Sequence, residues 1–210
     1  QWIGETIIHS QKRFSYEEAH NTLIAKEGPY ARELQTLDTL AEKLRTQRMK
    51  EGSLSFDQDE VKFKLDQNGV PLEIFLKQRL ATNLLIEDFM LLANRRVAEH
   101  FYKLSRAKNR DALFVYRIHD VPNQEKIEEL QVFLHAVGFS LKVTGGMVSG
   151  QEINRLFKEI EGKPEENLIK TATIRSMAKA VYSTRNIGHF GLAFRYYTHF
   201  TSPIRRYPDM

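Results

Sequence analysis

The residues best suited to chemistry lie near the carboxyl end of the sequence. Arg205 and Arg206 stand side by side in residues 197–210, which read YTHFTSPIRRYPDM. A guanidinium group offers its N–H donors in a planar fork that matches the oxygens of a phosphate. Ser202 followed by Pro203 is typical of a helix start, where free backbone N–H groups also favour anions. The segment therefore predicts a phosphate site, and its aromatic residues offer surfaces on which bases can stack. The alternative, equally open from the residues alone, is a set of core aromatics beside solvated arginines.

The elements that must position this segment alternate between helices and strands. Ser15 and Glu18 form a capping-box pattern at a helix start, and Asn68-Gly69 between alternating runs indicates a β-hairpin. Because the order is not a strict strand–helix–strand repeat, the fold class predicted is α+β. We expect helices at 16–28, 30–50, 81–104, 124–137, 150–160 and 165–182, a hairpin at 61–76, and strands at 112–118 and 189–194.

Composition narrows the class of protein further. The 210 residues carry 31 Lys and Arg against 27 Asp and Glu, a net charge of +4, which leans mildly toward anionic partners. The absence of Cys excludes disulfides and thiolate metal sites, and it fits a reducing cytoplasm. No apolar run approaches the roughly 20 residues that span a membrane. The histidines show no spacing typical of zinc ligands, so no metal site is predicted within the chain.

Residues 197–210 resemble the signature of the ribonuclease II / ribonuclease R family, in its RNB catalytic domain. Other stretches resemble the family in the same order along the chain, and the overall resemblance is strongest to its ribonuclease R branch. These stretches are residues 2–19, 60–71, 85–94 (LIEDFMLLAN), 116–122 (YRIHDVP) and 189–194 (HFGLAF).

The resemblance implies a processive enzyme that degrades single-stranded RNA from its 3′ end and releases nucleoside 5′-monophosphates with Mg²⁺. Arg205 would be the catalytic residue that contacts the phosphate being cleaved, and Arg206 would contact a backbone phosphate. Thr201 and Ser202 would offer hydroxyl groups. Tyr197 and His199 would shape the pocket for the 3′-terminal nucleotide, with packing as the alternative for at least one of them.

Glu87 and Asn94 lie seven residues apart, so they share one stripe of the expected helix 81–104. That helix is apolar on most sides, and a carboxylate and an amide in such surroundings need partners. One role is contact with the terminal nucleotides, which the resemblance supports for Glu87. The other role is a structural hydrogen bond to the backbone, which the surroundings favour for Asn94.

The family holds its Mg²⁺ with a cluster of aspartates N-terminal to the region that resembles this chain, so the chain does not contain the metal ligands. We therefore expect residues 1–210 to be a single partial RNB domain, truncated at both ends and inactive by itself. The alternatives are a non-catalytic RNA-binding or scaffold protein on the same fold, and an α+β interaction domain unrelated to RNA.

Overall fold

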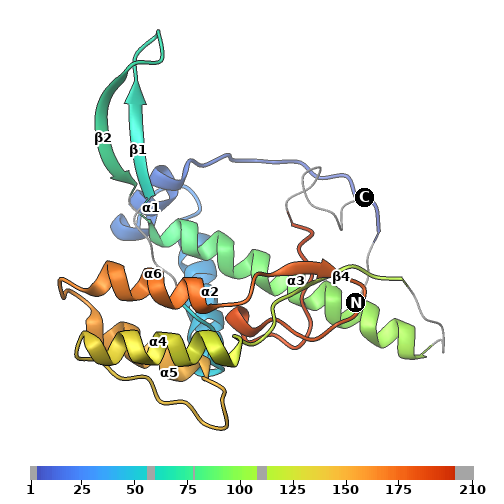
Figure 1. The fold of residues 1–210 in the computed structure, drawn as a ribbon. Coiled ribbons are helices and arrows are strands. Elements are labelled where there is room, and N and C mark those ends of the chain that lie inside the picture. The colour runs from blue at the N-terminus through green and yellow to red at the C-terminus, as the bar shows by residue number, and fades with distance from the viewer. Residues whose placement is uncertain (1–3, 56–59, 78, 108–112, 202–210) are drawn as a thin grey trace. The chain divides into compact units, whose positions relative to one another are not determined.

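The structure is a computed structural model that describes residues 4–55, 60–77, 79–107 and 113–201. The chain divides into two compact units, one formed by residues 1–42 and 60–87, the other by residues 43–59 and 88–210. Both contain helices, and each contains one small antiparallel sheet, so the predicted α+β class is confirmed (Figure 1).

The first unit begins with helix α1 (Tyr16–Ala25), and its predicted capping box is confirmed. The Ser15 hydroxyl accepts the Glu18 backbone N–H at 3.1 Å, and the Glu18 carboxylate accepts the Ser15 N–H at 2.8 Å. The helix ends at Ala25, before the predicted end near Gly28, because Lys26 adopts a left-handed conformation with φ 58°. Helix α2 (Ala31–Lys50) follows and contributes residues to both units.

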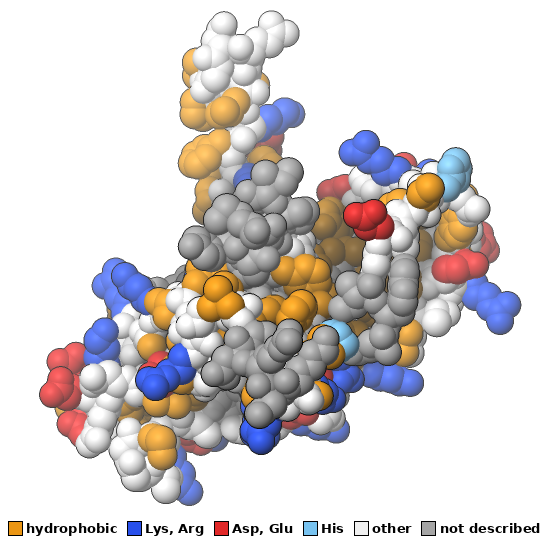
Figure 2. Space-filling view, turned by 90° about the vertical axis from the view of Figure 1, so that its right-hand side faces the viewer, with side chains coloured by type: hydrophobic (Ala, Val, Ile, Leu, Met, Phe, Trp, Pro, Cys, Tyr) orange, Lys and Arg blue, Asp and Glu red, His pale blue; other side chains and the backbone are white. Residues whose placement is uncertain are grey.

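A β-hairpin completes the first unit, as predicted. Strands β1 (Glu60–Leu65) and β2 (Pro71–Lys77) pair antiparallel, and the Asp66 carboxylate accepts the N–H groups of Asn68 and Val70 within the turn. The alternating pattern gives the hairpin one apolar face, and Figure 2 shows hydrophobic side chains gathered along it. The side chains of this face are each at least half exposed: Val61, Phe63, Leu65, Leu72, Ile74 and Leu76.

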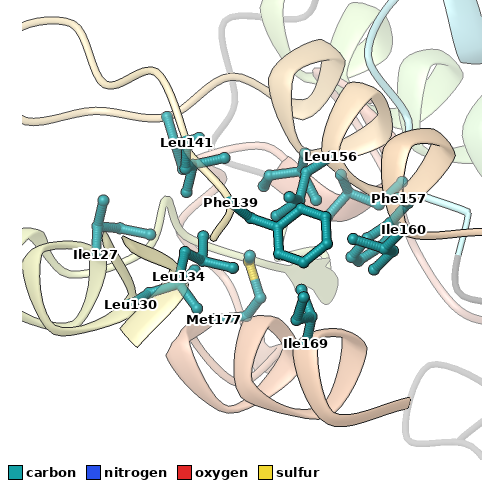
Figure 3. Packing of buried hydrophobic residues seen from close by; sticks show 13 residues of the cluster. Ile127, Leu130, Leu134, Phe139, Leu141, Leu156, Phe157, Ile160, Ile169 and Met177 are labelled. Carbon is teal, nitrogen blue, oxygen red and sulfur yellow. The ribbon is translucent and has the colours of Figure 1, made fainter. Parts of the chain in front are cut away.

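The main core belongs to the second unit and lies among three helices (Figure 3). These are α4 (Gln124–Ala136), α5 (Gly150–Ile160) and α6 (Glu166–Ser176). The Asn123 and Ser149 side chains cap the first two by accepting backbone N–H groups of the first turn. The most deeply buried members of the cluster are Ile127, Leu134, Ile153, Leu156, Ile160 and Ile169.

A long helix, α3 (Ala81–Ala107), supplies residues to both units. Within the second unit, Asp88 of α3 is 3% exposed and binds two arginines from the last turns of α2. Arg45 approaches its carboxylate at 2.8 Å and Arg48 at 2.6 Å. These ion pairs fix α3 against α2 in that unit.

Two predicted elements are wrong. The helix expected over 165–182 ends at Ser176, because residues 181–183 form strand β4 (Val181–Ser183) against β3 (Tyr116–Ile118). The strand expected over 189–194 is instead a 3₁₀ turn, η1 (Phe190–Leu192), in which the chain folds back and His189 pairs with Phe194. Strand β3 is also shorter than the run 112–118, since residues 113–115 are not in a strand.

No helix in the described part of the chain is both long enough and apolar enough to cross a bilayer.

Candidate functional site

The predicted phosphate site falls largely outside the described residues. Arg205, Arg206 and Ser202 all lie beyond Thr201, where the described part of the chain ends. Their roles therefore stay predictions. The residues that lead into them, 197–201, are described, and the second unit holds them through several polar contacts.

Asn94, in the middle of α3, forms hydrogen bonds with this segment. Its side-chain carbonyl accepts the backbone N–H groups of both Phe200 and Thr201, each at 3.2 Å. Its side-chain N–H donates to the Tyr197 hydroxyl at 3.3 Å. Asn94 is 2% exposed, so these bonds are shielded from water. This geometry corresponds to one of the two roles expected for Asn94, a structural hydrogen bond to the backbone. Contact of Asn94 with a nucleotide stays a prediction.

Strand β3 and the residue before it hold the segment from a second direction. The Arg117 N–H donates to the Tyr197 carbonyl at 3.0 Å, and the fully buried Thr198 hydroxyl donates to the Val115 carbonyl at 2.8 Å. The Tyr197 side chain is 6% exposed and contacts the His189 ring with a centroid separation of 5.2 Å. Tyr197 is thus a packed residue whose ring and hydroxyl both face protein groups.

Two histidines organise the turn that precedes the segment. The His119 Nδ1 accepts the Gly191 N–H at 3.0 Å, so its proton lies on Nε2, which donates to the Ala178 carbonyl at 2.8 Å. The His189 Nδ1 accepts the Leu192 N–H at 3.2 Å. A Cβ on Gly191 would lie 2.9 Å from the His119 Nδ1, so glycine is needed at this close approach.

Both histidines are held in the neutral form. Burial lowers the pKa of His119, and burial with the neighbouring His119 ring lowers the pKa of His189 to about 3. The two rings are 5.0 Å apart between centroids, in an edge-to-face arrangement. Because each ring accepts a backbone N–H, a proton on either accepting nitrogen would break a bond of the 189–194 turn.

A groove of about 1410 Å³ opens beside these histidines within the second unit. Its wall includes the paired rings of Tyr102 and Tyr196, whose centroids are 4.4 Å apart. Arg106 donates to the Tyr102 hydroxyl at 3.3 Å, and the Arg195 guanidinium lies over the Tyr196 ring, 5.4 Å from its centroid. A hydrogen bond from Tyr196 and the charge of Arg106 lower the pKa of the Tyr102 phenol. Aromatic faces beside cations can take an anionic, base-containing chain.

Glu87 lies in the first unit, near the start of α3, and forms an ion pair with Arg79. Both side chains are more than two-fifths exposed. The carboxylate is therefore oriented by a protein cation and accessible to solvent. Neither of the two roles open for Glu87 is excluded by this arrangement, and contact with a terminal nucleotide stays a prediction.

The two remaining predicted residues are His199, which contacts Tyr197, and Thr201, whose backbone N–H donates to Asn94. The His199 ring is tilted against the Tyr197 ring with a centroid separation of 6.3 Å. The Thr201 hydroxyl is buried and has no hydrogen-bond partner among the residues described. The structure thus brings Asn94, Tyr197, His199 and Thr201 together in the second unit.

Within the described ranges, no group of three or more His, Asp or Glu side chains is placed to hold a metal ion. The described residues therefore do not fit a magnesium site. The expectation that Mg²⁺ ligands come from outside the chain stays a prediction.

Sequence reasoning missed the histidine pair and the paired tyrosines. His119 and His189 both lie in stretches that resemble the family, YRIHDVP and HFGLAF, so the motifs marked them without indicating a role. Nothing local marks Tyr102 and Tyr196 as partners, because 94 positions separate them in the sequence and only the fold brings them together.

The fold and the anchored segment define an RNB-type domain, and comparison with known proteins agrees. The whole chain, residues 1–210, matches the RNB domain. The chain belongs to the RNB family.

Its similarity to ribonuclease R is substantial. It is 37% identical to ribonuclease R of Aquifex aeolicus and 39% identical to that of Thermotoga maritima, in each case over 99% of this chain and 29% of the relative. The solved structure of Mycoplasma genitalium RNase R in complex with ribose methylated single-stranded RNA matches 94% of this chain and 31% of that one, with 27% identity and a TM-score of 0.82. The chain thus spans about three-tenths of the length of these relatives, and the predicted resemblance is confirmed.

Proposed function

We propose that the protein containing this chain is an exoribonuclease that degrades single-stranded RNA processively from its 3′ end and releases nucleoside 5′-monophosphates. The observation that carries the proposal is the match to the RNB domain over residues 1–210, with 37% and 39% identity to two ribonucleases R. The neighbour from Mycoplasma genitalium bound to single-stranded RNA supports the class of substrate. The enzyme would act in the cytoplasm.

In this proposal the chain supplies the contacts to the phosphate and the terminal nucleotide. Arg205 contacts the phosphate being cleaved and stabilises the charge that develops there, and Arg206 contacts a neighbouring backbone phosphate. Ser202 and Thr201 offer hydroxyl groups, while Tyr197 and His199 shape the pocket for the 3′-terminal nucleotide. Mg²⁺ would supply metal-assisted phosphodiester hydrolysis, held by residues outside this chain.

Replacing the central arginine tests the proposal. In the full-length protein, we expect Arg205→Ala to lower turnover by about 100-fold or more while RNA binding falls little, because the lost contact acts on charge that develops in the transition state. Arg32→Ala, an exposed arginine on α2, is the matched control and should retain wild-type turnover. An Arg205→Ala enzyme with wild-type turnover would remove the assigned role.

The chain by itself should be inactive, since the metal ligands are proposed to lie elsewhere. Incubating the 210-residue chain with Mg²⁺ and a uniformly labelled single-stranded RNA should release no labelled mononucleotides. Its RNA affinity should fall with salt, with a logarithmic slope of about −0.7 for each phosphate contact. Mg²⁺-dependent release of mononucleotides by this chain would contradict the proposal.

A second candidate is a non-catalytic RNA-binding protein on the same fold. The structure of yeast Ssd1, a pseudonuclease, matches 99% of this chain with a TM-score of 0.67 at 21% identity, which is a likeness of fold alone. The full-length wild-type protein separates the two candidates. Salt-dependent RNA binding without any product, at every Mg²⁺ concentration tried, would favour the non-catalytic function.

A further inference from the structure

Asn94 has the bonding pattern of a residue that fixes a neighbouring strand of chain in place. A carboxamide can accept two hydrogen bonds and donate two, and Asn94 makes three of the four with residues 197–201. Each partner lies more than 100 positions away in the sequence. Such bonds define a tertiary contact, since no local turn or helix cap requires them.

Asn94 forms hydrogen bonds at both ends of residues 197–201. Two consecutive backbone N–H groups, those of Phe200 and Thr201, converge on its one oxygen, which sets the direction of the backbone at that point. The Tyr197 hydroxyl receives its N–H at the other end. The bonds that Arg117 and Val115 make with the same segment act on residues 197 and 198. Among the hydrogen bonds of the described residues, those of Asn94 are the ones that hold the backbone of residues 200 and 201.

The position of residue 201 matters because the predicted catalytic arginine follows closely. Arg205 is four residues beyond Thr201, so its backbone can lie at most about 14 Å away. Residues 200 and 201 are thus the last described residues before Arg205, and Asn94 binds the backbone of both. Misplacing a reacting group by about 1 Å can lower a rate by about 100-fold.

We propose that Asn94 is a positioning residue for catalysis, acting through the backbone of residues 200 and 201 on the placement of Arg205. This inference rests on the proposed exoribonuclease function. It assigns Asn94 no contact with RNA, because all three of its bonds are made to the protein and its side chain is buried.

The test compares three variants of the full-length protein. Asn94→Leu keeps the branching at Cγ and the number of side-chain heavy atoms, and it loses all three hydrogen bonds. Asn94→Asp keeps an oxygen for the two N–H groups, and its second oxygen can accept from the Tyr197 hydroxyl. Asn154→Leu is the matched control, because Asn154 likewise bonds to distant backbone, at Ser53 and Ser55, without touching residues 197–201.

Two readouts decide the outcome, both taken at a temperature where every variant is folded. Hydrogen exchange at the amides of residues 200 and 201 should quicken by about 10-fold or more in Asn94→Leu and stay unchanged in Asn154→Leu. The kcat of Asn94→Leu should fall by about 30-fold or more. Its KM for RNA should stay within about threefold of the wild-type value, as expected when RNA binding is intact. Asn94→Asp should recover most of the lost kcat.

Other results would overturn the inference. A wild-type kcat in Asn94→Leu would show that catalysis does not depend on the hydrogen bonds from Asn94 to residues 200 and 201. An equal loss in Asn154→Leu would show a general effect of reduced stability. A loss confined to KM would indicate direct RNA contact instead. If the wild-type protein hydrolyses no RNA, the proposed function fails. Separately, unchanged hydrogen exchange at the amides of residues 200 and 201 in Asn94→Leu would show that Asn94 does not hold them in place.

Discussion

Removing the Asp88 carboxylate should destabilise the second unit strongly. Asp88 is 3% exposed and bound by two arginines, of which the Arg48 side chain is 12% exposed and the Arg45 side chain 31%. Truncating one partner of a buried ion pair costs about 3–5 kcal/mol, because the remaining charge stays buried without its partner. Since Arg45 can turn toward water, we expect Asp88→Ala to lower the free energy of unfolding by about 3 kcal/mol, at the lower end of that range.

Thermal unfolding followed by circular dichroism measures this effect. For a chain of this size, a loss of about 3 kcal/mol corresponds to a Tm lower by about 6–12 °C. Glu99→Gln is the matched control, because Glu99 also binds two arginines, Arg95 and Arg96, but on the surface of its own helix. Such pairs contribute about 1 kcal/mol or less. Equal Tm values for Asp88→Ala and Glu99→Gln would refute the argument that burial sets the magnitude.

Three further predictions concern other contacts. The pKa of His189 is lowered to about 3 in the folded protein, so the unfolded chain binds more protons than the folded one between pH 3 and about 6.5. The free energy of unfolding should therefore fall as the pH drops through this range, by at most about 1.4 kcal/mol for each pH unit. In denaturant titrations, His189→Asn should flatten this pH dependence. A Cβ on Gly150 would lie 1.9 Å from the Gly52 carbonyl oxygen, so Gly150→Ala should cost about 2 kcal/mol or more in urea unfolding. Arg79→Ala should free the Glu87 carboxylate and change KM for RNA in the full-length enzyme, with little change in Tm because the ion pair is exposed.

Each of these predictions has its own control. Gly138→Ala places its Cβ in open space at a positive φ of 84°, so it reports backbone strain alone, about 1–2 kcal/mol. The wild-type protein, titrated with denaturant at the same pH values, is the reference for His189→Asn. An Arg79→Ala enzyme with an unaltered KM would show that the orientation of Glu87 is irrelevant to RNA binding, and a persisting acid slope in His189→Asn would assign that slope to other groups.

Local patterns predicted the elements whose causes are local. The capping box at Ser15, the Asn68-Gly69 turn and the Ser149 cap each depend on residues within a few positions of one another, and all three occur in the structure. The pattern at residues 177–182 also resembled a helix. There, pairing of β4 with β3 and the bond from His119 to the Ala178 carbonyl hold the chain extended instead.

The candidate site was less predictable, because its contacts are long-range. Residues 189–194 were predicted to form a strand, but the His189 side chain caps a 3₁₀ turn, and Ala193 adopts a φ of 54° that no propensity favours for alanine. Asn94 was recognisable as a buried polar residue needing partners. Its partners could not be named, since the bonds span 103 to 107 positions and require the packed α3.

The one-sided hairpin has a practical consequence for anyone preparing this protein. Its apolar face presents β-branched and aromatic side chains in paired strands, the combination that promotes self-association in concentrated solution. Stabilising salts such as sulfate should strengthen that tendency. Polar replacements at Phe63 and Ile74, a cross-strand pair on that face, would make a more soluble sample while leaving Asn94 and the histidine pair untouched.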